Sequence, residues 1–134
     1  MSKAVFYLLV LSLLNSCSKD KSENVGQCDT YLLINSTKTP RTSTISSGIK
    51  TIIDCYGPNL CYSFSGMEII EKEGNVFEIK AKGKAPCGPA ICLQAIYAVK
   101  DSATINIRMV GFYYLKFFNN DAATSFKTDT VVVN

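Results

Sequence analysis

The chain has 134 residues, a formal net charge of +3, and basic residues spread along the whole sequence. This length suits a single domain, and so small a positive charge gives no reason to expect a nucleic-acid partner. The sequence contains no histidine, which excludes catalytic units of the Ser-His-Asp or Cys-His kind, so we expect a protein that is not an enzyme and holds no cofactor.

The first segment has the features of an export signal. Lys3 precedes an apolar run at residues 4–14, which is shorter than the about 20 residues of a membrane-spanning helix and fits a signal peptide. The run ends in the letters LNSC, which resemble a bacterial lipobox, although Asn15 is not the usual small residue. We therefore expect cleavage of residues 1–16 and acylation of Cys17, by palmitate or a similar chain. Two or three acyl chains anchor a protein durably.

Residues 17–27 are predicted to be the lipidated cysteine and a flexible tether, because the stretch SKDKSENVGQ holds one large apolar residue. The folded domain is expected over residues 28–134. The charged stretch after Cys17 resembles the segment that follows the acylated cysteine in Bacteroidetes-type surface lipoproteins. This resemblance implies a lipid-anchored protein of the cell envelope, in the outer membrane, on its periplasmic or its surface face.

The first part of the domain predicts two short strands, at residues 28–34 and 49–53. Residues 35–48 between them are rich in Ser and Thr, and we expect a solvated connector there, with a ragged edge strand as the alternative. Residues 56–59 contain adjacent Gly and Pro, which indicates a turn.

The second part of the domain alternates with a period of two, which predicts half-buried strands. Residues 67–82 read as a hairpin around Glu73-Gly74-Asn75, with Phe77, Ile79 and Ala81 inward. Residues 91–99 also alternate, although a helix is not excluded. Residues 111–133 predict a closing hairpin with a polar turn at 119–121. Several short strands at this spacing predict an all-β fold, a single Ig-like antiparallel β-sandwich of about seven strands.

The closing hairpin is similar to the last two strands of small Ig-like lipoprotein domains of the Bacteroidetes type. The similarity rests on the pattern Gly-x-Tyr-x-Leu-x-Phe from Gly111 and on the ending FKTDTVVV, and it covers about residues 62–133. It places Tyr113 at the position of a tyrosine corner. A sandwich hosts many unrelated functions, so this similarity implies a fold and no activity. The chain contains no Trp, which separates it from antibody-type domains.

The cysteines predict disulfides, because an exported chain meets an oxidising compartment. With Cys17 acylated, five cysteines remain: Cys28, Cys55, Cys61, Cys87 and Cys92. Two bridges then leave one thiol free. Proximity in sequence favours Cys55 with Cys61 and Cys87 with Cys92, which leaves Cys28 unpaired. An alternative joins the two loops, for example Cys61 to Cys87.

The stretch APCGPAIC, residues 85–92, begins like a thioredoxin site. That site needs a second thiol three positions after the first, with two residues between them, but Ala90 stands there and Cys92 comes two residues later. We therefore read this stretch as a stapled turn. A zinc site of four cysteines is also disfavoured, because five and four residues intervene within the two near-pairs, at or beyond the usual two to four. We expect no metal.

These features predict a membrane-anchored envelope lipoprotein with a binding or structural role. Its expected partner, beyond the membrane, is a protein or a glycan that docks on loops or on a sheet edge. The alternative is a thiol-disulfide exchange protein that uses Cys87, Cys92 or a free Cys28. The two hypotheses differ in whether the folded protein has an exposed thiol of low pKa.

Overall fold

The computed structural model of this chain describes residues 25–119 and 125–134, and these ranges form strands and no helix. The predicted signal peptide, the acylation site Cys17 and part of the predicted turn at 119–121 lie outside the described residues. No described segment is a helix with the length and apolarity needed to cross a membrane. In chain order the strands are β1 Gln27–Lys38, β2 Thr42–Ser43, β3 Ile49–Gly57, β4 Ser63–Lys72, β5 Val76–Pro86, β6 Tyr97–Ile105, β7 Gly111–Phe118 and β8 Lys127–Val133.

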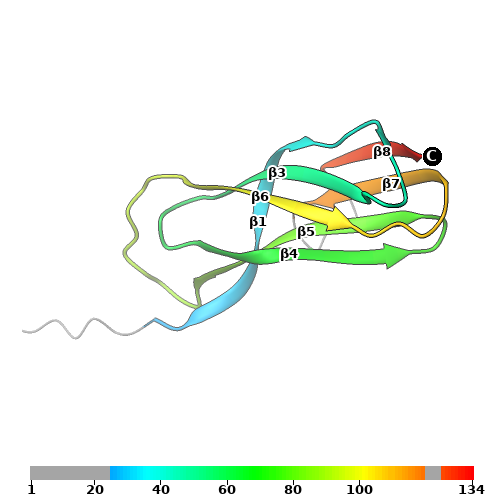
Figure 1. The fold of residues 1–134 in the computed structure, drawn as a ribbon. Coiled ribbons are helices and arrows are strands. Elements are labelled where there is room, and N and C mark those ends of the chain that lie inside the picture. The colour runs from blue at the N-terminus through cyan, green and yellow to red at the C-terminus, as the bar shows by residue number, and fades with distance from the viewer. Residues whose placement is uncertain (1–24, 120–124) are drawn as a thin grey trace, which may run out of the picture.

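Strand β1 takes part in both layers of the fold. Its residues 27–32 pair antiparallel with β5, and its residues 33–38 pair antiparallel with β3, with a register shift between Ile34 and Ser36. Figure 1 shows β1 crossing from the neighbourhood of β5 to that of β3. One layer therefore contains β6, β3 and the second half of β1, and the other contains β4, β5, β7, β8 and β2.

Strand β5 is the centre of the larger layer. Strand β4 pairs along one of its edges, while β7 and the first half of β1 share the other edge end to end. The pairings of β5 with β7 and of β2 with β8 are parallel. The predicted all-β sandwich is confirmed, with eight strands among the described residues and with two parallel pairings that the expected antiparallel arrangement did not include.

The core lies between the layers and follows the alternation of each strand. Phe77, Ile79 and Ala81 of β5 are buried, as their spacing predicted, and so are Leu115 and Phe117 of β7. Fully burying a large apolar side chain contributes roughly 1.5–3 kcal/mol. Buried aliphatic side chains of the opposite layer include Ile34, Ile49 and Ile53, while Leu32 is buried in the half of β1 that pairs with β5. The hydrophobic spacing that predicted the strands is therefore also what joins the two layers.

Only part of the Ser- and Thr-rich segment 35–48 is the solvated connector that we expected, since residues 39–41 and 44–47 lie outside the strands. Strand β1 continues into it as far as Lys38, and two of its residues form β2. Hydroxyl groups of this segment bond to carboxylates on other strands: Ser36 Oγ donates to Asp54 Oδ2 at 2.6 Å, and Thr37 Oγ1 donates to Asp129 Oδ2 at 3.0 Å. These partners, distant in sequence, satisfy the polar groups and allow the segment to join the sheet.

The tyrosine corner suggested by the family resemblance is present. Tyr113 is 4% exposed, and its hydroxyl donates to the backbone carbonyl of Met109 at 2.8 Å. Its ring stacks on that of Phe77, with 6.2 Å between the centroids. This hydrogen bond ties the connection between β6 and β7 to the start of β7.

Replacing Tyr113 by Phe is expected to lower the free energy of unfolding by about 1–2 kcal/mol, because the carbonyl of Met109 loses its buried donor. Urea unfolding of the two proteins measures the difference. The matched control is Tyr114→Phe, since Tyr114 is 40% exposed on the opposite face of the same strand. Equal effects of the two substitutions would contradict a special role for Tyr113.

Candidate functional site

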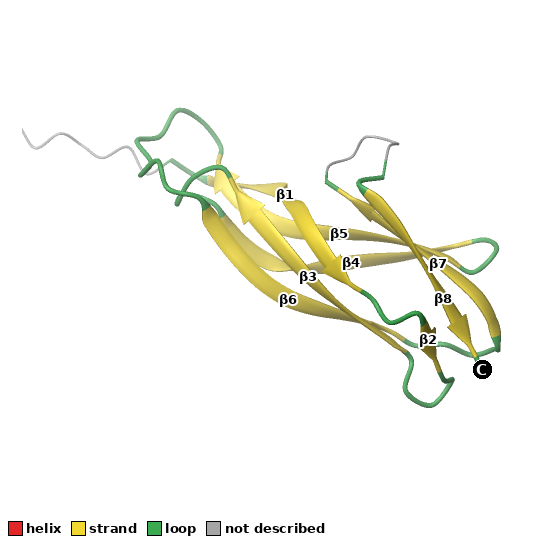
Figure 2. Ribbon diagram, turned by 90° about the horizontal axis from the view of Figure 1, so that it is seen from above, coloured by secondary structure: helices red, strands yellow, loops and turns green. Residues whose placement is uncertain are grey.

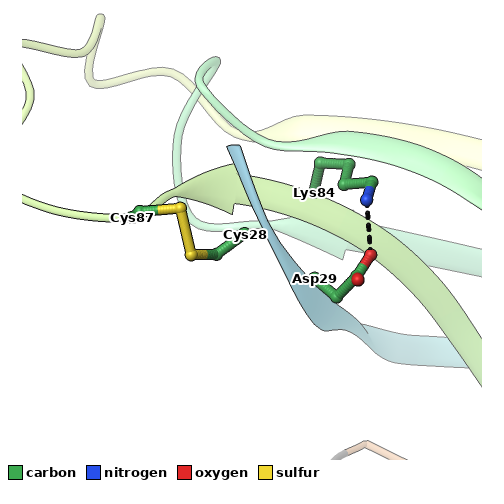
Figure 3. The surroundings of a disulfide bond; sticks show 4 residues. All are labelled: Cys28, Asp29, Lys84 and Cys87. Atoms are coloured by element: carbon green, nitrogen blue, oxygen red, sulfur yellow. Dashed lines mark hydrogen bonds and ion pairs between the residues drawn. A yellow bond between two sulfur atoms is a disulfide. The ribbon is translucent and has the colours of Figure 1, made fainter. Parts of the chain in front are cut away.

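Two disulfides gather at one end of the sandwich. Cys28 bonds to Cys87 across 59 residues of sequence, with 4.9 Å between their Cα atoms. Antiparallel pairing of β1 with β5 places Cys28 opposite Ala85, which brings Cys87 within reach. Figure 3 shows this bridge beside the ion pair between Lys84 Nζ and Asp29 Oδ1, whose atoms are 2.6 Å apart.

The second disulfide joins two loops. Cys61 follows β3, Cys92 follows β5, and their Cα atoms lie 5.6 Å apart. Beside this bridge the backbone amide of Leu60 donates to the carbonyl of Leu93 at 3.2 Å. The side-chain oxygen of Asn59 also accepts from the amide of Cys61 at 3.0 Å. These contacts fix the turn after β3 against the loop that precedes β6.

The cysteine pairing predicted from sequence proximity is wrong. Neither Cys55 with Cys61 nor Cys87 with Cys92 forms a bridge, and Cys28 is bonded rather than free. The alternative of Cys61 with Cys87 is wrong as well, although a bridge does join the two loops. Strand register and loop placement bring the true partners together, and proximity along the chain says little about either.

Cys55 is the one described cysteine outside a disulfide. It lies in β3, is 3% exposed, and belongs to the buried core cluster. Burial raises the pKa of its thiol to about 12, and the neighbouring carboxylates Asp54 and Asp101 add to the effect. An exchange reaction needs a thiolate that solvent and substrate can reach, so Cys55 is a core side chain.

The two bridges contradict the hypothesis of thiol exchange through Cys87 and Cys92 or through a free Cys28. Cys87 and Cys92 belong to two different bridges, so they cannot form a dithiol pair, and Cys28 is not a free thiol. Four cysteines that are oxidised offer no thiolates to a metal. Within residues 25–119 and 125–134, no cluster of three or more His, Cys, Asp or Glu side chains could hold a metal ion.

The disulfides clamp a loop that we define as residues 87–96 and name the clamped loop. The chain has no charged residue between Lys84 and Lys100. Ile91 is fully exposed on the clamped loop, Leu93 is 74% exposed and Ile96 is 70% exposed. An exposed group of large aliphatic side chains on a fixed loop is typical of an interaction surface.

Sequence reasoning placed residues 91–99 in a strand or a helix, but β6 begins only at Tyr97. The alternation of Ile91, Leu93, Ala95 and Tyr97 predicted a buried face, yet the first three are exposed. The missed signal is the uncharged span from Lys84 to Lys100, because an ordinary surface loop usually carries charged or polar residues.

The outer face of the smaller layer has a hollow of about 660 Å³, lined in part by Asp54, Tyr56 and Ile96. Both carboxylate oxygens of Asp54 have partners there: Ser36 Oγ donates to Oδ2, and Lys100 Nζ lies 3.3 Å from Oδ1. The hydrogen bond from Ser36, followed by the contact with Lys100, lowers the pKa of this carboxyl. An ionised, paired carboxylate is a poor general acid at neutral pH.

The disulfide pairing makes a sharp prediction for a tryptic digest without reduction. Residues 22–38, 51–72 and 85–100 are separate tryptic peptides, and the two observed bridges join all three into one cross-linked species. Mass spectrometry before and after reduction detects it. Separate peptides with internal bridges would instead indicate the local pairing and contradict the structure.

The buried thiol predicts a pH dependence with a definite sign. The ordinary pKa of a cysteine thiol is 9.0, and burial raises the pKa of Cys55 to about 12 in the folded protein, so the unfolded state loses its proton first. Stability is therefore retained below about pH 9 and falls as the pH rises toward 12, by at most about 1.4 kcal/mol per pH unit.

Urea unfolding at pH 8 and pH 10 tests this, with Cys55→Ala as the comparison. We expect the wild-type protein to lose about 1 kcal/mol more than the variant over this interval. The Ala variant retains all other groups that titrate in this range, so it serves as the control. An identical loss in the two proteins would show that the thiol is not shielded.

The sequence was also compared with known proteins. The comparison with curated proteins gave no match, and neither did the comparison with solved structures. Residues 51–128, which are more than half of the chain, match the family described as ORF11 beta-sandwich domain. The match begins within β3, ends within β8, and includes the clamped loop and four of the five cysteines of the folded domain. The chain therefore belongs to the ORF11 beta-sandwich domain family.

Proposed function

We propose that this protein is a lipid-anchored envelope protein with a non-enzymatic binding role, and that the clamped loop is its binding surface. One observation carries the proposal: two disulfides hold a loop without charges whose large aliphatic side chains lie in solvent. Such side chains would gain stability from burial against a partner, at roughly 25 cal/mol for each Å² removed from water.

The disulfides support a binding role through pre-organisation. The clamped loop is bonded near its start at Cys87 and within it at Cys92, while the backbone contact of Leu93 with Leu60 holds its middle. A loop already fixed in one conformation loses less conformational entropy when a partner covers it. Rigid side chains can therefore contribute most of their burial energy to binding.

The carboxylates support a role without acid–base chemistry. Lys84 lowers the pKa of Asp29 through a side-chain hydrogen bond and through its charge. Ser36 lowers the pKa of Asp54. A general acid that works near neutral pH needs a raised pKa, and these two groups are shifted the opposite way.

The anchor rests on the sequence before the described residues. Cys17 ends the LNSC pattern after an apolar run, which fits processing at this cysteine. The two disulfides add support, because stable structural disulfides are expected in exported proteins and are rare in the cytosol.

The experiment is expression of the full chain in a bacterium that processes lipoproteins, followed by membrane fractionation and intact mass. We expect the wild-type protein in the membrane fraction, beginning at Cys17 and carrying acyl mass. Cys17→Ser should abolish acylation and release the protein from the membrane fraction, because the thiol receives the lipid.

The matched control is Ser18→Ala, which changes the next residue and should leave acylation intact. An unacylated wild-type protein that begins at another residue would overturn the proposed anchor. The disulfide map of Cys17→Ser should equal that of the wild type, which separates loss of the anchor from loss of the fold.

A further inference from the structure

We infer that the partner of the clamped loop is the lipid bilayer that carries the anchor, with Ile91, Leu93 and Ile96 seated among the lipid headgroups and upper acyl chains. This inference rests on the proposed acylation of Cys17. It deepens the proposed function by naming the surface that the clamped loop binds.

The first argument is the position of the chain entry. The amide of Cys87 donates to the carbonyl of Gly26 at 2.8 Å, so the described chain begins at the root of the clamped loop. The Cys28–Cys87 disulfide holds the two segments together there. In Figures 1 and 2 the start of β1 and the loop that follows β5 lie at the same end of the molecule.

The second argument is the length of the chain outside the structure. Only residues 18–24 separate Cys17 from the described chain, and such a segment spans at most about 25 Å when fully extended. A lipid on Cys17 therefore keeps the clamped loop close to the bilayer surface. Because a short tether gives a high effective concentration, even a weak contact between loop and lipid is populated.

The third argument is the chemistry of the clamped loop. With no charge between Lys84 and Lys100, this span can enter the headgroup region without the cost of desolvating an ion. Interfacial segments bury their apolar side chains about 5–10 Å deep at this boundary. Leu60, which is half exposed and bonded to Leu93 through the backbone, extends the same apolar surface.

A second exposed apolar group provides a comparison. Met109, Val110 and Phe112 are each about as exposed as Ile96, at 64%, 62% and 60%. They lie at the other end of the sandwich, because β7 pairs with the start of β5 at Val76 while the clamped loop follows its end at Pro86. The length of β5 separates the two groups by about 33 Å. Comparing them therefore distinguishes docking through one end of the molecule from nonspecific adsorption of any exposed apolar side chain.

The experiment uses tryptophan as a depth probe, because the chain contains none. The acylated full chain with Leu93→Trp is extracted from membranes and reconstituted into vesicles of phosphatidylethanolamine and phosphatidylglycerol. Lipids with brominated acyl chains then quench a tryptophan that touches the apolar region. We expect the tryptophan emission to shift to shorter wavelength in the vesicles. We also expect the brominated lipids to quench most of its intensity, since the side chain at position 93 is exposed on the clamped loop.

The matched control is Phe112→Trp in the same vesicles, and its emission should keep its wavelength and intensity. A second pair of variants tests the contact directly. Adding Ile91→Asp to Leu93→Trp should reverse the shift and the quenching, whereas adding Val110→Asp should not. All four positions are exposed, and an unchanged disulfide map verifies each fold.

The outcomes separate the inference from the proposed function. Quenching at Leu93→Trp and not at Phe112→Trp supports docking on the bilayer. Protein that floats with the vesicles but shows no quenching at Leu93→Trp overturns it, leaves the anchor standing and assigns the clamped loop to a protein or glycan. Equal quenching at both positions also overturns it. Wild-type protein that does not float overturns the proposed anchor and this inference together.

Discussion

Strand β1 is bonded to both layers, and the closure of the sandwich depends on this double pairing. Its first half completes one edge of β5, while its second half pairs with β3 in the other layer. At the crossing point Leu32 and Ile34 are buried, and the amide of Ile34 donates to the side-chain oxygen of Asn119 at 2.6 Å. A sheet that passes from one layer to the other in this way encloses its core without a helix to cover it.

Local alternation made the two hairpins and their inward faces predictable. Phe77, Ile79 and Ala81 face inward because neighbouring side chains on a strand point to opposite sides, and this needs no knowledge of the partner strand. The role of Tyr113 was implied by the resemblance to Ig-like domains, and its hydroxyl bonds to a carbonyl only four residues upstream. The extension of β1 was not predictable, because its hydroxyls depend on Asp54 and Asp129, which lie far along the chain.

The candidate site was less predictable than the fold. Which cysteine stays free is decided by burial at Cys55, and which cysteines pair is decided by the register of β1 on β5 and by the meeting of two loops. The spacing of cysteines along the chain predicts neither the burial of a thiol nor the register of two strands. The alternation around Leu93 was misleading for the same reason, since a period of two predicts a strand only where a neighbouring strand is present to pair with it. The uncharged span was the one usable signal.

The Cys28–Cys87 bridge also determines how mechanical force enters the domain. A pull on the chain ahead of Val25 would act on the end of β1 and would peel its hydrogen bonds from β5 one at a time. The bridge lies at the second residue of β1, so peeling stops almost at once and the load passes through a covalent bond into β5. That strand is bonded along both edges, so it distributes the load as shear over the whole larger layer.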